Sequence, residues 1–498
     1  MTQPAPLDAQ PQAGETKVQD ARPDPSPRTV LMVLYFFPPV GGISTSRNIR
    51  NVQYLPWSGW SPVVVTPAEA AYDVKDPSLL ELVSPSVEVL RTRSVEAGHV
   101  RAWVMAIGSA LRLRRPRRPR PPETQSADTG GGSAAFDATG SKERDGLLFR
   151  LRRFVFFPDD QVGWLPFALR AALRRHGTAP IDVVYSTASP ITSHLVAGLL
   201  KQRTGVPWVA EFRDPWLGTA LSKPIPWLHR RIKAKVERWI IRTADQVVFL
   251  APSTARMYQE RYPFASNFVV IPNGYDRSEA TPSARTREAG RRFRIVYTGL
   301  LFRPIELTVF LEGLDRLLTR RPELTDELEV VFLGSVDPTC QEIADRARAS
   351  DRLGRVVEFQ GYVPRRDALQ AVADADAALV LLGAGPSMGV YIPGKLFDYL
   401  GQSQQILAMV PRGDAWNLLE ELGWGVIAEP DPAEVERAIE RVMTLPRPSG
   451  PADPDGRYDR AVLARRLAET LDAAVEAGSR SRDTATVRRV ADRAAGEP

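Results

Sequence analysis

One ten-residue segment combines a turn, a cation and a carboxylate at a spacing that could do chemistry. It reads Tyr391-Ile392-Pro393-Gly394-Lys395-Leu396-Phe397-Asp398-Tyr399-Leu400 and lies between two strand-like apolar runs, 377–382 and 405–410. The Pro-Gly pair predicts a turn that opens a short helix. Lys395 and Asp398 are three residues apart, so they share one face of that helix.

This pair suits a particular kind of ligand. A cation beside the free backbone N–H groups of a helix start is a good place for a phosphate. A carboxylate one turn later can accept hydrogen bonds from two neighbouring hydroxyls, such as those of a ribose. Lys395 and Asp398 together therefore suit a nucleotide diphosphate. An ordinary helix start with a solvated ion pair is the alternative that the segment alone leaves open.

The composition indicates a soluble globular protein. The chain has 498 residues, enough for two domains plus extensions, with 43% apolar and 25% charged residues. Its single cysteine, Cys340, excludes a disulfide framework or a cysteine metal site and favours a reducing compartment. The four histidines have no metal-ligand spacing, so no metal site is predicted. No segment approaches the roughly 20 apolar residues that span a bilayer, and we expect a cytoplasmic location.

Three segments lack the periodicity of packed structure. Residues 1–28 are rich in Pro, Gln, Ala and Asp, without the basic start and apolar run of a signal peptide, and predict a disordered tail. Residues 112–144 are rich first in Arg and Pro, then in Gly, Ser, Ala and Asp, and predict a disordered insertion. Residues 476–498 predict a second polar, disordered tail.

The basic excess of the chain, a net charge of +6, is concentrated in the arginines of 112–120. These are Arg112, Arg114, Arg115, Arg117, Arg118 and Arg120. Because a short apolar run precedes them, the stretch suits an anionic membrane surface. No aromatic platform or basic recognition helix lies nearby, so nucleic acid is not the expected partner. A solvated charge run is the alternative.

Two series of alternating strand and helix patterns organise the chain. The first predicts strands at 29–37, 63–65, 87–90, 182–186, 207–212, 246–250 and 267–271; the second predicts strands at 294–297, 328–333, 356–359, 377–382, 405–410 and 425–428. Such alternation implies an α/β fold with two Rossmann-like, doubly wound domains and a ligand cleft between them. We expect domains at 29–276 and 277–445, followed by a C-terminal helix within 446–475.

Several motifs then occur in a fixed order. They are Tyr35-Phe36-Phe37-Pro38-Pro39-Val40-Gly41-Gly42, Pro158-Asp159-Asp160-Gln161-Val162-Gly163-Trp164, Tyr185-Ser186-Thr187-Ala188-Ser189-Pro190, Pro207-Trp208-Val209-Ala210-Glu211-Phe212-Arg213-Asp214-Pro215-Trp216, Ile271-Pro272-Asn273-Gly274-Tyr275-Asp276, Tyr297-Thr298-Gly299 and the 391–400 segment. In this order, from about residue 29 to 474, the chain resembles retaining GT-B glycosyltransferases of the family 4 group, in particular a bacterial sub-group.

The resemblance implies a fold, an activity and partners. The fold would be GT-B, with an acceptor domain first and a donor domain second. The enzyme would transfer a sugar from a UDP- or GDP-type nucleotide-sugar, without a cofactor or bound metal, to a hydroxyl of a lipid-linked or polysaccharide acceptor in cell-envelope or exopolysaccharide synthesis. Anomeric configuration would be retained. The protein would lie at the inner face of the plasma membrane if the arginine cluster attaches it there.

The donor-side residues follow from the matching motifs. They are Gly41, Gly42, Gly299, Arg303, Gly394, Lys395 and Asp398. The two glycines at 41–42 let the backbone approach a phosphate closely, with a plain turn as the alternative. Residues 43–47 contain no glycine, which counts against a dinucleotide oxidoreductase. Arg303 would place a guanidinium against the diphosphate, or be an exposed loop residue.

At two positions the chain departs from the family pattern. Asp398 matches the second acid of a Glu-x7-Glu pair, but the first acid falls at Val390. Arg213 replaces a histidine that contacts the transferred sugar in many relatives, and Asp214 follows it. We expect Arg213 to steady developing charge and Asp214 to accept a proton or fix the sugar; a structural ion pair is the alternative.

Acceptor contacts are expected from Asp159, Asp160, Trp164 and His194, unless the loop residues hold a turn and the histidine is structural. Two other functions remain open. A nucleotide-sugar epimerase would use a similar cleft but would need an acid and a base that flank the sugar. A non-catalytic nucleotide-sugar-binding protein of an envelope assembly complex would fit the departures at Val390 and Arg213.

Overall fold

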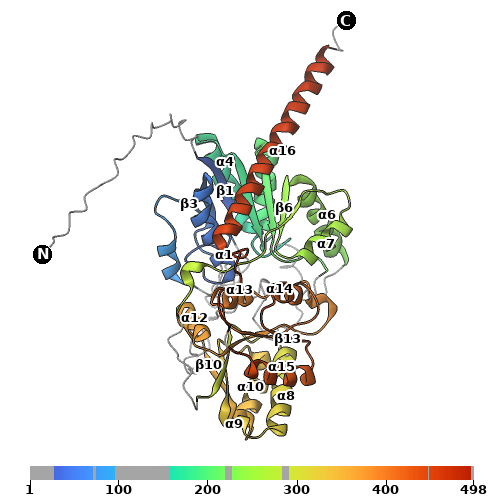
Figure 1. The fold of residues 1–498 in the computed structure, drawn as a ribbon. Helices are drawn as coiled ribbons and strands as arrows, with labels where there is room; N and C mark the ends of the chain where they lie inside the picture. Colours follow the sequence, from blue (N-terminus) through green and yellow to red (C-terminus); the bar gives the residue numbers. More distant parts are fainter. Residues whose placement is uncertain are drawn as a thin grey trace, which may run out of the picture.

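The computed structural model describes residues 27–70, 75–95, 157–218, 227–282, 291–446 and 448–494. These residues form two α/β units, each with one parallel sheet between layers of helices (Figure 1). The predicted N-terminal tail, apart from Pro27 and Arg28, lies outside the described residues. The same holds for the predicted insertion at 112–144 and its cluster at Arg112–Arg120.

The N-terminal unit contains a seven-stranded parallel sheet in the order β3-β2-β1-β4-β5-β6-β7. Its strands are β1 (Arg28–Val33), β2 (Trp60–Pro67), β3 (Glu88–Thr92), β4 (Val183–Ala188), β5 (Trp208–Phe212), β6 (Gln246–Phe249) and β7 (Phe268–Val270). The central strands are buried on both faces, which explains why the sequence reads there as unbroken apolar runs rather than alternating ones.

Helices cover both faces of this sheet. One face packs against α1 (Ile43–Tyr54) and the C-terminal helix α16 (Arg460–Ala494). The other packs against α4 (Leu165–Thr178), α5 (Thr192–Thr204), α6 (Trp227–Thr243) and α7 (Pro252–Arg261). Alternate residues of each strand enter the two cores, as the pleat requires.

The C-terminal unit repeats this plan with six parallel strands in the order β10-β9-β8-β11-β12-β13. The strands are β8 (Phe293–Thr298), β9 (Leu328–Leu333), β10 (Val357–Gly361), β11 (Ala377–Leu381), β12 (Ile406–Met409) and β13 (Val426–Ala428). The helices are α8 (Pro304–Arg320), α9 (Leu324–Glu327), α10 (Pro338–Ala349), α11 (Leu353–Val356), α12 (Arg365–Ala373), α13 (Gly394–Gly401), α14 (Asp414–Leu422) and α15 (Pro432–Thr444).

Each strand that the sequence predicts is present, with ends displaced by a few residues. The largest difference is at β1, which ends at Val33 although the apolar run continues to Phe37. The residues after Val33 remain buried in the turn that leads to α1, so their hydrophobicity reflects burial rather than strand pairing. The strand also begins at Arg28, inside the expected tail.

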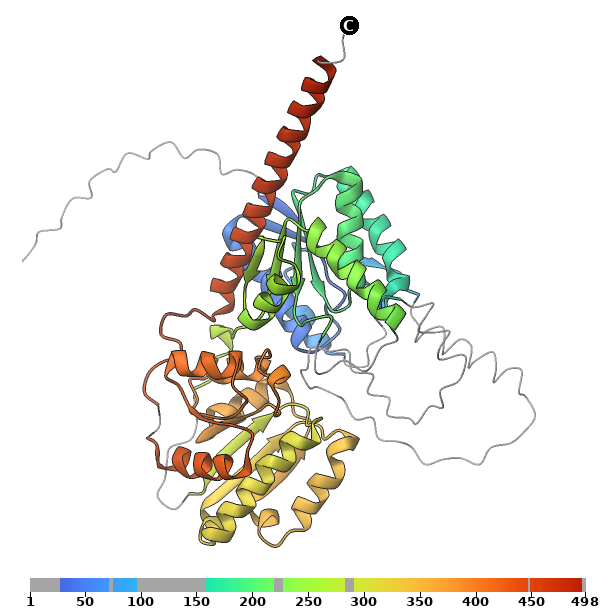
Figure 2. The ribbon, with the colours of Figure 1, turned by 90° about the vertical axis from the view of Figure 1, so that its right-hand side faces the viewer.

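The C-terminal helix returns to the N-terminal unit. Leu463, Leu467 and Leu471 of α16 pack into the core formed with β1, β2 and β4. Figure 2 shows α16 running along this unit and continuing past it. The prediction that residues 476–498 are disordered is wrong up to Ala494, because the helix continues that far. The first unit is therefore built from both ends of the chain.

This packing predicts that α16 stabilises the N-terminal unit. Leu467 is 2% exposed, so Leu467→Ala should lower the free energy of unfolding by about 2–5 kcal/mol. Val462, on the same helix, is 38% exposed, and Val462→Ala should change stability by only about 0.5 kcal/mol. Chemical denaturation of both variants measures the difference. Equal effects would contradict the packing.

Candidate functional site

The loop with Gly41 and Gly42 and the loop with Gly299 lie at equivalent points of the two sheets. Strand order reverses between β1 and β4 in the first sheet and between β8 and β11 in the second. Ligands of doubly wound folds bind at such points, outside the carboxyl ends of the strands. Gly41 and Gly42 follow β1, and Gly42 precedes α1 with φ of 101°. Gly299 follows β8 with φ of 107°, a conformation that favours glycine.

Lys395 lies against the second of these loops. Its Nζ is 3.5 Å from the centroid of the Tyr297 ring, and a Cβ added to Gly299 would be 3.3 Å from the same Nζ. Burial lowers the pKa of the Lys395 ammonium to about 7, although Glu306 and Asp398 act to raise it. The lysine and the glycine thus form one wall of the predicted phosphate site.

Glu306, which the sequence analysis missed, anchors the loop after β11. Its Oε1 accepts a hydrogen bond from the backbone N–H of Gly383 (2.7 Å) and forms an ion pair with Arg303 Nη1 (3.2 Å). Arg303 Nη1 also lies 3.2 Å from Met388 Sδ. Burial raises the pKa of Glu306. Arg303 and Glu306 therefore hold the segment that leads to Val390, and a phosphate contact by Arg303 stays a prediction.

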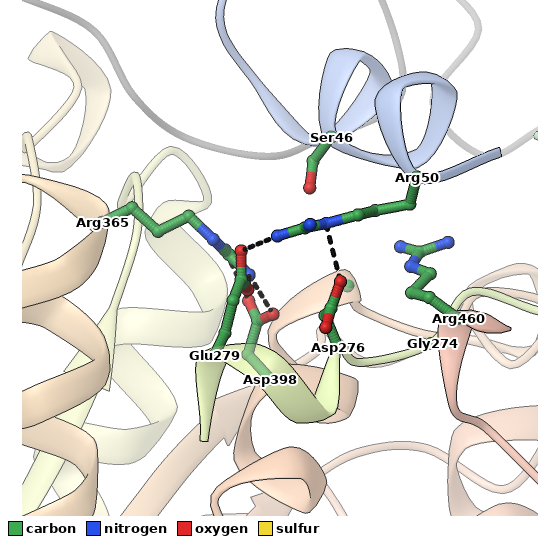
Figure 3. Close-up of a pocket in the computed structure, with 9 residues that line it drawn as sticks. Ser46, Arg50, Gly274, Asp276, Glu279, Arg365, Asp398 and Arg460 are labelled. Carbon is green, nitrogen blue, oxygen red and sulfur yellow. Dashed lines mark hydrogen bonds and ion pairs between the residues drawn. The ribbon is translucent and has the colours of Figure 1, made fainter. Parts of the chain in front are cut away.

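Asp398 is held by Arg365, at the start of α12. Its two carboxylate oxygens lie 2.8 and 3.3 Å from the guanidinium nitrogens of Arg365, which also forms a 2.7 Å ion pair with Glu279 (Figure 3). Glu279 lies in the segment that connects the two units. The predicted ribose-binding carboxylate thus already has a cationic partner in this structure.

Arg50 of α1 joins the same network from the first unit. It forms ion pairs of 2.8 Å with both Asp276 and Glu279 (Figure 3). Tyr54 donates a 2.8 Å hydrogen bond to Asp276. Burial acts to raise the pKa of Glu279, but Arg365 and Arg50 lower it overall. A chain of alternating charges therefore runs from α1 through the connecting segment to α12 and α13.

A small cavity of about 20 Å³ lies within this network, room for about one water. Its lining includes Ser46 near the start of α1, Gly394 at the start of α13, Asp398, and Arg460 at the start of α16. Arg460 is 7% exposed, and its Nη1 has no hydrogen-bond partner among the described residues. Burial and the nearby Arg47 lower the pKa of Arg460 to about 9. The starts of α1 and α13 are thus neighbours across the junction.

The end of β5 is fixed by a buried ion pair. Arg47 of α1 lies 2.6 Å from Glu211 of β5, and its other donors bond to the carbonyls of Ile271 (3.1 Å) and Pro272 (2.7 Å). Thr187 also donates to Glu211, at 3.0 Å. The pair sets the position of the glycine loop relative to β5.

Arg213 follows β5 and braces the neighbouring loop. Its Nε and Nη2 donate to the carbonyls of Ala188 and Ser189, both at 3.1 Å, and burial lowers its pKa while Asp214 acts to raise it. Asp214 is partly exposed at the carboxyl end of the strand. The catalytic roles of Arg213 and Asp214 stay predictions, with Asp214 the more accessible of the two.

The units also meet through α7 and α14. Ser253 at the start of α7 donates from its backbone N–H (3.0 Å) and its hydroxyl (2.8 Å) to the carboxylate of Asp414 at the start of α14. The carboxylate of one unit thereby caps a helix of the other. This contact, like the charge network, holds the two units together.

Two acceptor-side predictions are wrong. Trp164 is completely buried, stacks edge-on against Tyr35 and donates to Thr92 Oγ1 at 2.7 Å. His194 is also completely buried, between Trp208 and Phe212. Its Nδ1 is 2.8 Å from Ser186 Oγ, which accepts from Trp208 Nε1. Both side chains belong to the core because their helices turn these positions toward the sheet.

The two acidic residues differ from each other. Asp159 accepts hydrogen bonds from the backbone N–H (2.9 Å) and hydroxyl (2.6 Å) of Thr192, so it caps α5 rather than facing a ligand. Burial raises the pKa of Asp159. Asp160 is partly exposed, and its acceptor role stays a prediction.

Comparison with solved structures gives the fold. A sucrose-phosphate synthase from Thermosynechococcus elongatus matches with a TM-score of 0.52 at 15% identity, covering 92% of this chain and all of that one. The lipopolysaccharide outer core galactosyltransferase WaaB matches with a TM-score of 0.52 at 12% sequence identity. The match covers 90% of this chain and 99% of WaaB. HepE from Anabaena, in complex with UDP and glucose, matches with a TM-score of 0.50 at 14% sequence identity. The match covers 92% of this chain and 100% of HepE.

The activity class comes from a family model. Residues 129–279 match the model of Glycosyltransferase Family 4. The protein is a GT-B glycosyltransferase. A comparison with curated proteins gives no match. In the described part of this glycosyltransferase, no helix is long and apolar enough to cross a membrane, and no group of three or more His, Cys, Asp or Glu side chains could hold a metal.

The burial of His194 predicts a pH effect on stability. Burial lowers the pKa of His194 to about 3, from about 6.5 in an unfolded chain. Between these values the unfolded state binds one more proton, so the free energy of unfolding should fall as pH falls, by up to about 1.4 kcal/mol per pH unit. His194→Phe and His194→Gln should both lose this component in denaturation curves at about pH 7 and 5. If the unfolding free energy of the variants depends on pH as that of the wild type does, His194 binds its proton as readily in the folded state as in the unfolded state.

Proposed function

We propose that the protein is a retaining glycosyltransferase that transfers a sugar from a UDP- or GDP-type nucleotide-sugar to a hydroxyl of a lipid-linked or polysaccharide acceptor in cell-envelope or exopolysaccharide synthesis. The observation that carries the donor assignment is Lys395 against Gly299, at the switch point of the second sheet. A position at the inner membrane face, through Arg112–Arg120, is part of the proposal.

The donor side has the charge that a diphosphate needs. A phosphate beside Lys395 would also meet the free backbone N–H groups at the start of α13. HepE, which shares the fold, is described in complexes with UDP and with UDP-glucose, and this favours UDP as the first nucleotide to test. The ribose would bind at Asp398, in competition with Arg365.

The reaction places negative charge on the departing diphosphate. In the proposed mechanism, Lys395 and the α13 N–H groups would lie where this charge develops and would stabilise the transition state more than the ground state. We assign no base among the described side chains, so we propose that a phosphate oxygen accepts the proton of the acceptor hydroxyl on the face that the nucleotide leaves. Attack from that face retains the anomeric configuration. No metal or cofactor is required.

Val390 keeps a second function open. An aliphatic side chain at that position cannot hydrogen-bond a sugar hydroxyl, so the sugar would depend on the backbone of Gly389 to Tyr391. A protein that only binds nucleotide-sugars would tolerate this loss. An epimerase would need an acid and a base that flank the sugar, and we assign no such pair.

Turnover separates these functions. The full chain should release nucleotide from a UDP- or GDP-sugar only when an acceptor with a free hydroxyl is present, without loss of rate in a chelator. Proton NMR of the product should show the anomeric configuration of the donor. An inverted product would exclude the proposed mechanism. Binding without release would support the non-catalytic binder, and sugar interconversion without an acceptor would support the epimerase.

The pKa of Lys395 predicts how UDP affinity depends on pH. At a pKa of about 7 the empty site is half-protonated at neutral pH, whereas a bound diphosphate favours the charged form. Affinity should therefore be highest below about pH 7 and fall above it, approaching tenfold per pH unit as binding takes up one proton. Isothermal titration calorimetry in buffers of different ionisation enthalpy measures this uptake.

Two variants provide the controls. Lys395→Met should bind UDP weakly with a flat pH profile. Lys395→Arg should keep a charge at each pH, bind more tightly than Lys395→Met and also lose the proton uptake, because arginine does not deprotonate in this range. Proton uptake in Lys395→Met equal to that of the wild type would show that another group responds to the diphosphate.

A further inference from the structure

Helix α6 presents an apolar and cationic surface on the N-terminal unit. Its inner face, with Glu237, Ile240 and Ile241, is buried against the sheet. Its outer face carries Trp227 (69% exposed), Leu228 and Ile232. Monomeric proteins rarely expose tryptophan, leucine and isoleucine side by side without a use for them.

The same outer face is strongly basic. Cationic residues at helical spacing continue the line that Trp227 begins: Arg231, Lys235, Arg238 and Arg242, with Arg230 beside them. Among the described residues, no carboxylate forms an ion pair with any of these five side chains. The single acid of the helix, Glu237, faces inward to Arg261, Tyr258 and Tyr262. The outward charge is therefore not neutralised within the described residues.

Aromatic residues mark both ends of this surface. Arg231 lies 5.7 Å from the ring centroid of Trp227 at the first turn. Arg238 and Arg242 lie 5.3 and 4.9 Å from that of Phe264, which is also exposed. Since α6 has 17 residues, the surface is about 25 Å long.

The first turns of α6 lie near the predicted reaction centre. Lys233 Nζ is 5.1 Å from the ring centroid of Trp216, two residues beyond Asp214. In a doubly wound unit a helix begins at the edge of the sheet where ligands bind. The first turn of α6 is therefore at the edge of the sheet where the strands end, and the helix packs on the face opposite the one that α16 covers (Figure 2).

We propose that the outer face of α6 docks the enzyme on an anionic bilayer. Arginine and lysine would meet the phosphates of the headgroups, while Trp227, Leu228 and Ile232 enter the interface, the division seen in helices that lie on membranes. Docking there would bring the end of β5, with Asp214 and Trp216, toward the bilayer that holds a lipid-linked acceptor, and to that extent the inference rests on the proposed function.

Charge distinguishes a bilayer from a second copy of the chain. A two-fold self-contact would place α6 against α6, and the cations of both copies would repel each other. The exposed apolar side chains also favour a bilayer over a nucleic acid, because the phosphate backbone of a nucleic acid would contact only the cations.

Co-sedimentation of the full chain with vesicles tests the proposal. The wild type should bind vesicles of phosphatidylcholine with phosphatidylglycerol, not phosphatidylcholine alone, and salt should weaken the binding. Arg231→Ser with Lys235→Ser should reduce binding about fivefold for each cation removed. Trp227→Ser with Ile232→Ser should also reduce it.

The chain offers matched controls. Trp57 is 74% exposed but lies beside α1, on the opposite face of the sheet, and Trp57→Ser should leave vesicle binding unchanged. Arg366→Ser with Arg441→Ser removes two exposed cations from the second unit and should also leave it unchanged. Thermal unfolding verifies that each variant is folded, and transfer to a water-soluble acceptor should persist in the α6 variants.

The outcomes separate docking from chemistry. Vesicle binding that depends on α6 would support docking even if no donor is turned over, in which case only the proposed function fails. The docking proposal is overturned if the α6 variants bind anionic vesicles like the wild type, if neutral vesicles bind equally well, or if the α6 substitutions change only self-association.

Discussion

The buried ion pair between Arg47 and Glu211 is the constraint on which the site depends. Both side chains are almost inaccessible to water, so each would be costly to bury without the other. Removal of one partner from such a pair typically costs about 3–5 kcal/mol. The pair ties the first turn of α1, and with it Gly41 and Gly42, to the carboxyl end of β5. Through the carbonyls of Ile271 and Pro272 it also fixes the start of the connecting segment.

That segment connects ligand binding to the junction between the units. Glu279 is shared by Arg50 of the first unit and Arg365 of the second, and Arg365 also holds Asp398. A ribose that bonds to Asp398 must weaken the contact with Arg365. Arg365 would then depend more on Glu279, which also holds Arg50. If a ribose binds Asp398 as proposed, it would therefore alter the contacts that position the first unit.

The sequence is sufficient to predict the strands, but it does not predict which charged residues pair with each other. Strands of parallel sheets are buried on both faces, so each appears as an apolar run whatever its neighbours are. Because β8 and β11 are neighbours, the loop after β8 and the start of α13 lie at the same edge of the second sheet, where Lys395 meets Gly299. In contrast, Arg47 and Glu211 are separated by 164 residues, and the sequence does not say which of many arginines meets which acid. Trp164 and His194 were misassigned because a motif does not show which way its side chains point.

On the predicted donor side, the charges of Arg303, Arg365 and Lys395 are accommodated in two different ways. Arg303 and Arg365 each form an ion pair with a carboxylate, Glu306 and Asp398 respectively. Lys395 rests against an aromatic ring, and burial brings its pKa to about 7, so it can be neutral until an anion arrives. A permanently charged side chain in its place would require an acid that then competes with the substrate. In the proposed donor site, a titratable amine would therefore leave the phosphate position free and become charged when the diphosphate binds.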